Sequence, residues 1–341
     1  MRFKEKQSPT KGTLFPKWEC NNFSFLRSFP PDMLLHQFPD LAWLKVQAEK
    51  NFADRQGWGG RELPHEGWPN VALQVSATET CRDNIRGPLS LFMNLSGESV
   101  VTAGKRRVVV PEDFFFVTNP DQYYTLEIER RQAAETFNIH FGDYFADQVF
   151  HAFSPSEAHL LDHPFECPHE RLEFHNRLHH RSPELNRIVA EISQAPELPS
   201  LWLEEKLTDV VYLLLSEEKK LLSLRAGLPV LKSSTRAEIL RRLLQVTDYI
   251  HTHLDKDISL EQLSRIACLS KFHFLRLFKV AFQATPYQFI NTERIRRAKK
   301  MMQHTTLEVQ EVAKTLGYEN ASAFSRMFFR QVGMYPSQLR G

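Results

Sequence analysis

Two arginines occupy equivalent positions in a repeated motif near the C-terminus, where their side chains could recognise DNA. The segment Phe274-Leu-Arg-Leu-Phe278 recurs fifty residues later as Phe324-Ser-Arg-Met-Phe328. An arginine guanidinium can donate two parallel hydrogen bonds to the major-groove edge of guanine. Arg276 and Arg326 are therefore candidates for base contacts. The alternative is that they are surface charges or bind phosphates.

A short amphipathic helix and a tight turn are predicted before each copy of the motif. The first helix covers residues 260–267 and is followed by Cys268-Leu-Ser270, and the second covers residues 309–316 and is followed by Gly317-Tyr318. Ser259 and Gln262 predict a capping box at the start of the first helix. Helix, tight turn and helix form the unit whose second helix enters the major groove.

The spacing within the first motif separates a buried face from an outer face. Phe274, Leu277, Phe278 and Ala281 follow the i, i+3, i+4, i+7 pattern of a core-facing stripe. The residues left on the outer faces of the two second helices are Phe272, Leu275, Arg276 and Lys279, and Ser322, Ser325, Arg326 and Phe329. Exposed Phe272 and Leu275 suit contacts with thymine methyl groups. The alternative for the aromatic Phe272 is that it packs on a neighbouring domain.

A single helix is predicted between the two units, over residues 286–304. Nineteen residues at about 1.5 Å each span roughly 28 Å, and successive major grooves on one face of DNA repeat about every 34 Å. The helix can therefore hold two recognition helices at a separation that suits neighbouring major grooves of DNA. Its basic residues face either phosphates or solvent, and they are Arg294, Arg296, Arg297, Lys299 and Lys300.

The segment from Leu243 to Arg340 resembles the DNA-binding domain of the AraC/XylS family of bacterial transcription regulators. The resemblance is carried by ISLEQLSRIACLS, HFLRLFK, Arg294 and Arg297-Ala298, EVAKTLGYENASAFSRMFF and GMYPSQLR. It implies a regulator that binds a double-stranded DNA operator. The residues then expected at the DNA are Ser270, Lys271, Phe272, Leu275, Arg276, Lys279, Asn320, Ser322, Ser325 and Arg326.

Three residues depart from the family pattern. Cys268 stands where a turn glycine is usual, Gln283 replaces the glycine that ends the first recognition helix, and Glu308 stands where a serine often caps the second unit. We expect these changes to affect stability locally and to leave both recognition helices intact.

The distribution of charge supports a separate nucleic-acid-binding domain. The formal net charge is +2, yet residues 235–341 carry 17 basic and 9 acidic side chains, against 26 and 32 in residues 1–234. A basic block joined to a mildly acidic one is typical of a DNA-binding domain attached to a domain with another role. A chain of 341 residues is also long enough for two folded units.

The sequence of the first two-thirds of the chain predicts an α+β organisation with a β-rich sensor domain. Seven short strands separated by turns are expected, over residues 71–77, 89–95, 99–103, 106–110, 113–118, 123–129 and 135–141. The family resemblance implies that they form a cupin-like β-barrel that binds a small-molecule effector. Its aromatic lining would be Phe114, Phe116, Tyr123 and Tyr124, with ordinary core packing as the alternative. We therefore expect a helical and loop extension (1–70), the barrel (71–155), a helical dimerisation region and linker (156–234) and an all-α DNA-binding domain (235–341).

A homodimer is predicted from an apolar stripe on the helix 201–222. The stripe comprises Leu203, Leu207, Val210, Val211, Leu214 and Leu215. Pairing between subunits would bury it, and symmetric dimers are the commonest soluble assembly. The alternative is that the stripe packs against the chain's own β-domain.

An enzyme is not expected. Between residues 71 and 150 there is no His-x-His with a following Glu, His179-His180 are expected at the surface or in the core, and His65-Glu66 lacks the second His of a metalloprotease motif. The cysteines, Cys20, Cys81, Cys167 and Cys268, are too scattered for a zinc module. We expect no metal or cofactor and no membrane partner. The expected location is the bacterial cytoplasm, and RNA polymerase is a candidate partner. The effector, the operator and the choice between activation and repression are left open.

Overall fold

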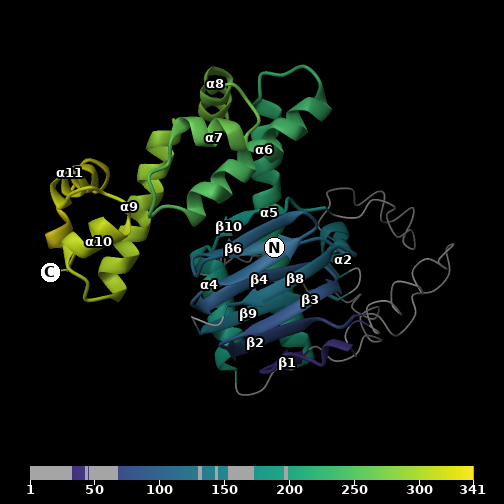
Figure 1. The fold of residues 1–341 in the computed structure, drawn as a ribbon. Helices are drawn as coiled ribbons and strands as arrows, with labels where there is room; N and C mark the ends of the chain where they lie inside the picture. Colours follow the sequence, from purple (N-terminus) through teal and green to yellow (C-terminus); the bar gives the residue numbers. More distant parts are fainter. Residues whose placement is uncertain are drawn as a thin grey trace, which may run out of the picture.

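The computed structural model of the chain has a β-rich part and a helical part that contact each other (Figure 1). It describes residues 33–42, 45, 68–129, 133–142, 145–152, 173–195 and 199–340. Most of the extension predicted over residues 1–70 lies outside these ranges. Within it, Met33–Leu35 forms strand β1 and not part of the helical and loop extension that was expected, because it pairs in parallel with β2 (Val71–Ala77).

The β-rich part consists of two sheets. One has six strands in the order β1-β2-β9-β4-β7-β10 and the other has four in the order β3-β8-β5-β6. The remaining strands are β3 (Thr80–Arg86), β4 (Ser90–Ser96), β5 (Ser99–Ala103), β6 (Arg106–Val110), β7 (Phe114–Thr118), β8 (Tyr123–Ile128), β9 (Ala134–His140) and β10 (Leu178–His180). The β-rich expectation is confirmed, but as two sheets with their own edges and not as one closed barrel.

Strand β7 explains how the sheets and helices are layered. All five of its residues are buried, as expected for a strand covered on both faces. Phe114 and Phe116 belong to the core between the sheets, with Phe92 and Leu126. Phe115 and Val117 point to the opposite side, into a second core.

Helices cover that second side of the six-stranded sheet. They are α2 (Phe145–Ala152), α4 (Pro183–Gln194) and α5 (Ser200–Gly227). In α4 the apolar residues Leu185, Ile188, Val189 and Ile192 are buried, and Ser182 caps its first turn by accepting from the Leu185 backbone N–H.

The apolar stripe of α5 packs within the chain and does not form the dimer interface that the sequence predicted. Leu203, Leu207, Val210, Val211 and Leu214 are 0–2 % exposed, and they share one core with sheet residues including Leu91, Met93 and Phe137. The physical reason is that the outer face of this sheet is itself apolar and would otherwise face water. The assignment of this stripe to a subunit interface was therefore wrong.

The helical part contains two small cores joined by one helix. It comprises α6 (Ser233–Thr252), α7 (Leu260–Ile266), α8 (Lys271–Phe282), α9 (Pro286–His304), α10 (Val309–Thr315), α11 (Ala321–Val332) and the 3-10 helix η2 (Pro336–Arg340). Ile290 of α9 packs in the first core with α6, α7 and α8. Ile295, Ala298 and Met302 of the same helix pack in the second core with α10 and α11. None of the described helices is long and apolar enough to cross a membrane.

Candidate nucleic-acid interface

The first helix-turn-helix unit consists of α7, a four-residue turn (267–270) and α8. Ser259 caps α7 by accepting from the Gln262 backbone N–H at 3.2 Å, and Ser270 caps α8 by accepting from the His273 N–H at 3.4 Å. The Gln262 side chain donates to the Tyr249 hydroxyl on α6 and so does not close the capping box that the sequence predicted. This contact ties α7 to α6 instead.

Helix α8 has the two faces expected from its sequence. Phe274, Leu277, Phe278 and Ala281 are buried, and the opposite face is left to solvent. On that face Arg276 and Lys279 are exposed and Leu275 is partly buried. Phe272 is 79 % exposed, so this large aromatic side chain has no neighbouring domain covering it within the described part of the chain. The alternative that it packs on another domain of the chain is not observed.

The second unit, α10 and α11, repeats this arrangement. Phe324 and Phe328 are buried, Arg326 and Ser322 are exposed and Ser325 is partly buried. Asn320 caps α11 by accepting from the Ala323 N–H at 2.8 Å. Figure 1 shows the two units at opposite ends of α9. The equivalent arginines of the repeat thus lie on the outer faces of two helices held by one connector.

Each unit has a left-handed residue after its first helix and another after its second helix, but the residue types differ between the units. Cys268 has φ 50° and Gln283 has φ 53°, whereas the corresponding positions of the second unit are Gly317 at 71° and Gly333 at 80°. These are left-handed conformations, which cost residues other than glycine about 1–2 kcal/mol. The departures from the family pattern therefore leave the shape intact and place strain in the first unit.

Three basic side chains are available for DNA. Among the described residues, Arg276, Lys279 and Arg326 have no hydrogen bond or ion pair partner. Lys271 differs, because its Nζ lies 3.0 Å from Oε2 of Glu261 on α7. Ser270 and Asn320 already use their side chains as caps. At these two positions the exposed helix N-termini offer backbone N–H groups to a phosphate.

The basic residues of α9 have mostly structural partners. Arg294 donates to the carbonyl oxygens of Leu254 and Lys256 at 2.9 and 2.6 Å and lies over the Tyr318 ring, so it joins the two units. Arg296 pairs with Glu293 one turn earlier. Lys300 pairs with Asp113 of the β-rich part and has Glu112 at 3.8 Å. Only Arg297 and Lys299 remain as candidates for phosphate contact on this helix.

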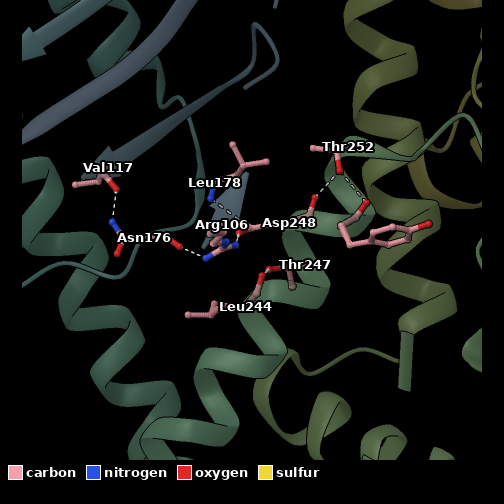
Figure 2. A network of polar contacts seen from close by, with 9 residues as sticks. Arg106, Val117, Asn176, Leu178, Leu244, Thr247, Asp248 and Thr252 are labelled. Carbon is pink, nitrogen blue, oxygen red and sulfur yellow. Dashed lines mark hydrogen bonds and ion pairs between the residues drawn. The ribbon is translucent and has the colours of Figure 1, made fainter. Parts of the chain in front are cut away.

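The β-rich part contacts the helical part through a buried polar network (Figure 2). Arg106 of β6 forms an ion pair with Asp248 of α6 and donates to the Asn176 carbonyl oxygen. The second carboxylate oxygen of Asp248 accepts from the Leu178 backbone N–H at 3.0 Å. Burial raises the pKa of Asp248 to about 6, against the opposing effect of Arg106. The sequence offered no local signal for this network, because its members are far apart in the chain.

Two histidines meet a glutamate at the same boundary. His180 Nε2 of β10 lies 3.1 Å from Glu293 Oε2 of α9, and His251 Nδ1 of α6 lies 3.3 Å from the same oxygen. Phe114 covers both imidazoles, with ring centroids 4.2 and 4.6 Å away. Burial, together with neighbouring positive charges, lowers the pKa of both histidines, that of His251 to about 3. His180 was expected at the surface or in the core, and it lies instead between domains.

A cavity of about 670 Å³ opens beside these residues. It lies between the start of β7 and helices α6 and α9, and its polar lining includes Glu112, Asp113, Arg181, Arg296, Arg297 and Lys300. Of the four residues predicted to bind an effector, only Phe114 lines it. Phe116 and Tyr124 are in the core between the sheets, and Tyr123 is 42 % exposed.

Comparison with known proteins is informative for the helical part. Residues 263–341 match a protein family described as a helix-turn-helix domain. A 96-residue segment is 33 % identical to the probable transcriptional regulator LumQ of Photobacterium leiognathi, covering 28 % of this chain and 39 % of that protein. A 91-residue segment is 31 % identical to the HTH-type transcriptional regulator AlkR of Acinetobacter baylyi, covering 27 % and 30 %. The matches thus span less than half the length of these curated relatives.

Among solved structures, the DNA-binding domain of AdpA in complex with a target DNA is 28 % identical. The similarity covers 29 % of this chain and 89 % of the AdpA chain, with a TM-score of 0.29.

The C-terminal part of the chain is a helix-turn-helix domain of the kind found in bacterial transcriptional regulators. The resemblance of the C-terminal segment to the DNA-binding domain of AraC/XylS regulators is supported by this family match over residues 263–341 and by the similarity to these transcriptional regulators.

Proposed function

We propose that this protein is a sequence-specific transcription regulator that inserts α8 and α11 into successive major grooves of a DNA operator. The observation that carries the proposal is the repeat of one exposed, unpaired arginine on two equivalent helices joined by α9. In this proposal Arg276 and Arg326 contact guanine, and Phe272 and Leu275 contact thymine methyl groups. Ser322 and Ser325 contact bases from the second unit.

The remaining predicted DNA residues are assigned to phosphates. Ser270 and Asn320 lie at helix N-termini, where backbone N–H groups attract anions. Lys271 and Lys279 supply charge. Phosphate contacts fix the register of the protein on DNA and base contacts supply sequence information.

Selection of binding sites from random duplexes by the full chain tests this proposal. We expect the selected sequences to contain two conserved blocks about one helical turn apart, each including a guanine. Arg276→Ala should erase preference in one block and Arg326→Ala in the other. Selection of a single short block, or of no sequence at all, would contradict insertion of both helices.

We further propose that a small molecule bound by the β-rich part controls DNA binding and is not chemically changed. The cavity beside Phe114 supports this role, because α9, which holds both helix-turn-helix units, forms part of its wall. A ligand that binds there should raise the melting temperature by mass action and change operator affinity by favouring one arrangement of the two parts. Turnover of the ligand by the purified protein would contradict the non-enzymatic role.

Two partners remain predictions: a second copy of the chain, and RNA polymerase. A homodimer would tether two DNA-binding domains and raise their effective concentration at a paired operator. Since the α5 stripe is internal, the dimer contact belongs on another surface. Light scattering at micromolar concentration, with and without operator, tests the dimer. The regulator is proposed to act in the bacterial cytoplasm, where its operator DNA lies.

A further inference from the structure

The cluster of His180, His251 and Glu293 has the composition of a metal site. One ligand atom from each residue lies within 4.8 Å of the others. His251 and Glu293 are buried, at 5 % and 7 % exposure, and His180 is half-buried. Two imidazoles and one carboxylate are the protein ligands of several open zinc sites, which keep a further position for water or another ligand.

The geometry of the cluster suits metal coordination better than hydrogen bonding. His180 Nε2 and His251 Nδ1 are buried without a hydrogen-bond partner among the described residues, although each lies near Glu293 Oε2, at 3.1 and 3.3 Å. Tetrahedral ligands about 2.0–2.1 Å from zinc lie roughly 3.3 Å from each other. A buried nitrogen without a partner is unfavourable, and a metal bond would remove that cost from both histidines.

One cation already competes for the carboxylate. The guanidinium of Arg296 pairs with Glu293 Oε2, and Arg181, Arg297 and Lys300 line the adjacent cavity. The side chain of Arg296 is 44 % exposed, so it can rotate away when a metal binds. Because these positive charges oppose a bound cation, they set its affinity, and removing Arg296 should strengthen binding.

We propose that His180, His251 and Glu293 bind a divalent transition metal of the zinc class, with an open coordination position toward the cavity. The three ligands come from β10, α6 and α9, so the metal joins the β-rich part to the helix that holds both DNA-binding units. Occupancy therefore fixes the arrangement of the two parts. This last consequence rests on the proposed function, whereas metal binding does not.

Binding of Zn²⁺ and Co²⁺ to the chelator-treated full chain tests the site. We expect His251→Ala, His180→Ala and Glu293→Gln each to lower Zn²⁺ affinity by tenfold or more, and Arg296→Gln to raise it severalfold. His175→Gln is the matched control, because His175 pairs with Glu218 at 2.6 Å outside the cluster. The Zn²⁺ affinity of this variant should equal that of the unsubstituted protein. Equal Zn²⁺ affinity in the unsubstituted protein and all three ligand variants would overturn the site.

Cobalt absorption separates a lost ligand from a damaged fold. The unsubstituted protein should give the intense visible bands of four- or five-coordinate Co²⁺, and Glu293→Gln should lose them while keeping its far-ultraviolet circular dichroism. A weak octahedral spectrum that is unchanged by Glu293→Gln would overturn the proposal.

The effect on DNA is measured separately. Zn²⁺ should raise the melting temperature and change operator affinity in the unsubstituted protein but not in His251→Ala. Zn²⁺ binding at the cluster without a change in operator affinity would refute the regulatory consequence alone. If the selection from random duplexes yields no operator, the proposed function is refuted. The measurement of metal binding does not depend on that result.

Discussion

Asp248 and Arg106 form an ion pair across the boundary between the helical and the β-rich part, although 142 residues separate them in the chain. The carboxylate side chain is 6 % exposed and that of the arginine 24 %. Breaking a buried pair by removing one partner is strongly destabilising, because the other charge is left unpaired. This pair thus connects the first helix of the DNA-binding domain to the four-stranded sheet.

Asp248 should make the stability of the protein depend on pH. Its pKa is raised from 3.8 to about 6 by burial, so the folded state binds a proton more tightly than the unfolded state. The resulting stabilisation is fully present below about pH 4 and is lost as the pH rises through about 6. The free energy of unfolding of the unsubstituted protein, minus that of Asp248→Asn, should fall by up to about 3 kcal/mol between pH 4 and pH 7.

Urea denaturation of both proteins at several pH values measures this difference. The neutral asparagine can still accept from the Leu178 N–H through its carbonyl oxygen, so this hydrogen bond is kept in the comparison. A difference that stays constant with pH would show that Asp248 titrates at its ordinary pKa, and a difference that grows with pH would show a lowered pKa. Either result would contradict the raised pKa of Asp248.

The two repeat arginines should affect specificity more than general affinity. Arg276→Ala and Arg326→Ala should each cost about 1–3 kcal/mol at the selected operator and relax selectivity at one base pair. Lys279→Ala should weaken binding on all sequences alike and reduce the salt slope by about 1. Fluorescence anisotropy across a salt series distinguishes the two behaviours.

Arg187→Ala is the control for these variants, since Arg187 is an exposed arginine on α4 in the β-rich part, 2.8 Å from Glu191. Its substitution should leave operator affinity unchanged. Equal weakening by Arg276→Ala on specific and random DNA would reassign that residue to phosphate contact.

Glycine should stabilise the first helix-turn-helix unit at its two strained positions. Cys268→Gly and Gln283→Gly relieve positive φ angles of 50° and 53°, and each should raise the free energy of unfolding by about 0.5–1 kcal/mol. Thermal or urea denaturation measures the change. A loss of stability at both positions would mean that the side chains contribute more than the backbone strain costs.

Replacing the two glycines of the second unit by alanine should lower stability, because these positions have the same left-handed backbone. A Cβ at Gly317 would lie 2.8 Å from the Asp255 carbonyl oxygen and 2.9 Å from the Arg294 guanidinium, whereas one at Gly333 would meet nothing within 4 Å. Gly333→Ala should therefore cost about 1–2 kcal/mol from backbone conformation alone, and Gly317→Ala should cost more. Equal losses in denaturation experiments would contradict this difference.

Leu207 should behave as a core residue and not as an interface residue. It is 0 % exposed against the outer face of the six-stranded sheet, so Leu207→Ala should lower the free energy of unfolding by about 2–5 kcal/mol. Leu207→Glu should prevent proper packing of the β-rich part instead of giving a folded monomer. Leu201→Ala is the control on the same helix, because Leu201 is 68 % exposed. A well-folded Leu207→Glu protein with altered oligomeric state would contradict the internal packing.

The sequence by itself determined the elements that repeat or alternate locally. The F-x-R-x-F repeat, the stripe through Phe274 and Phe278 and the span of α9 were all predicted and are confirmed, since a helix of 3.6 residues per turn fixes which side chains share a face. The alternating and continuous apolar runs likewise predicted seven of the strands. Strand β3 was missed because its polar sequence, TCRDNIR, has no such pattern.

Tertiary structure alone decided what each buried face contacts. An apolar stripe such as that of α5 must be covered, but its period is the same whether the cover is a second subunit or the chain's own sheet. Likewise Arg294 looked like its basic neighbours on α9, yet only the fold brought it to the Leu254 carbonyl oxygen. His180, His251 and Glu293 converge because three elements far apart in sequence meet at one boundary. Local spacing carries no information about such long-range contacts, which arise when separate elements bury their apolar surfaces together.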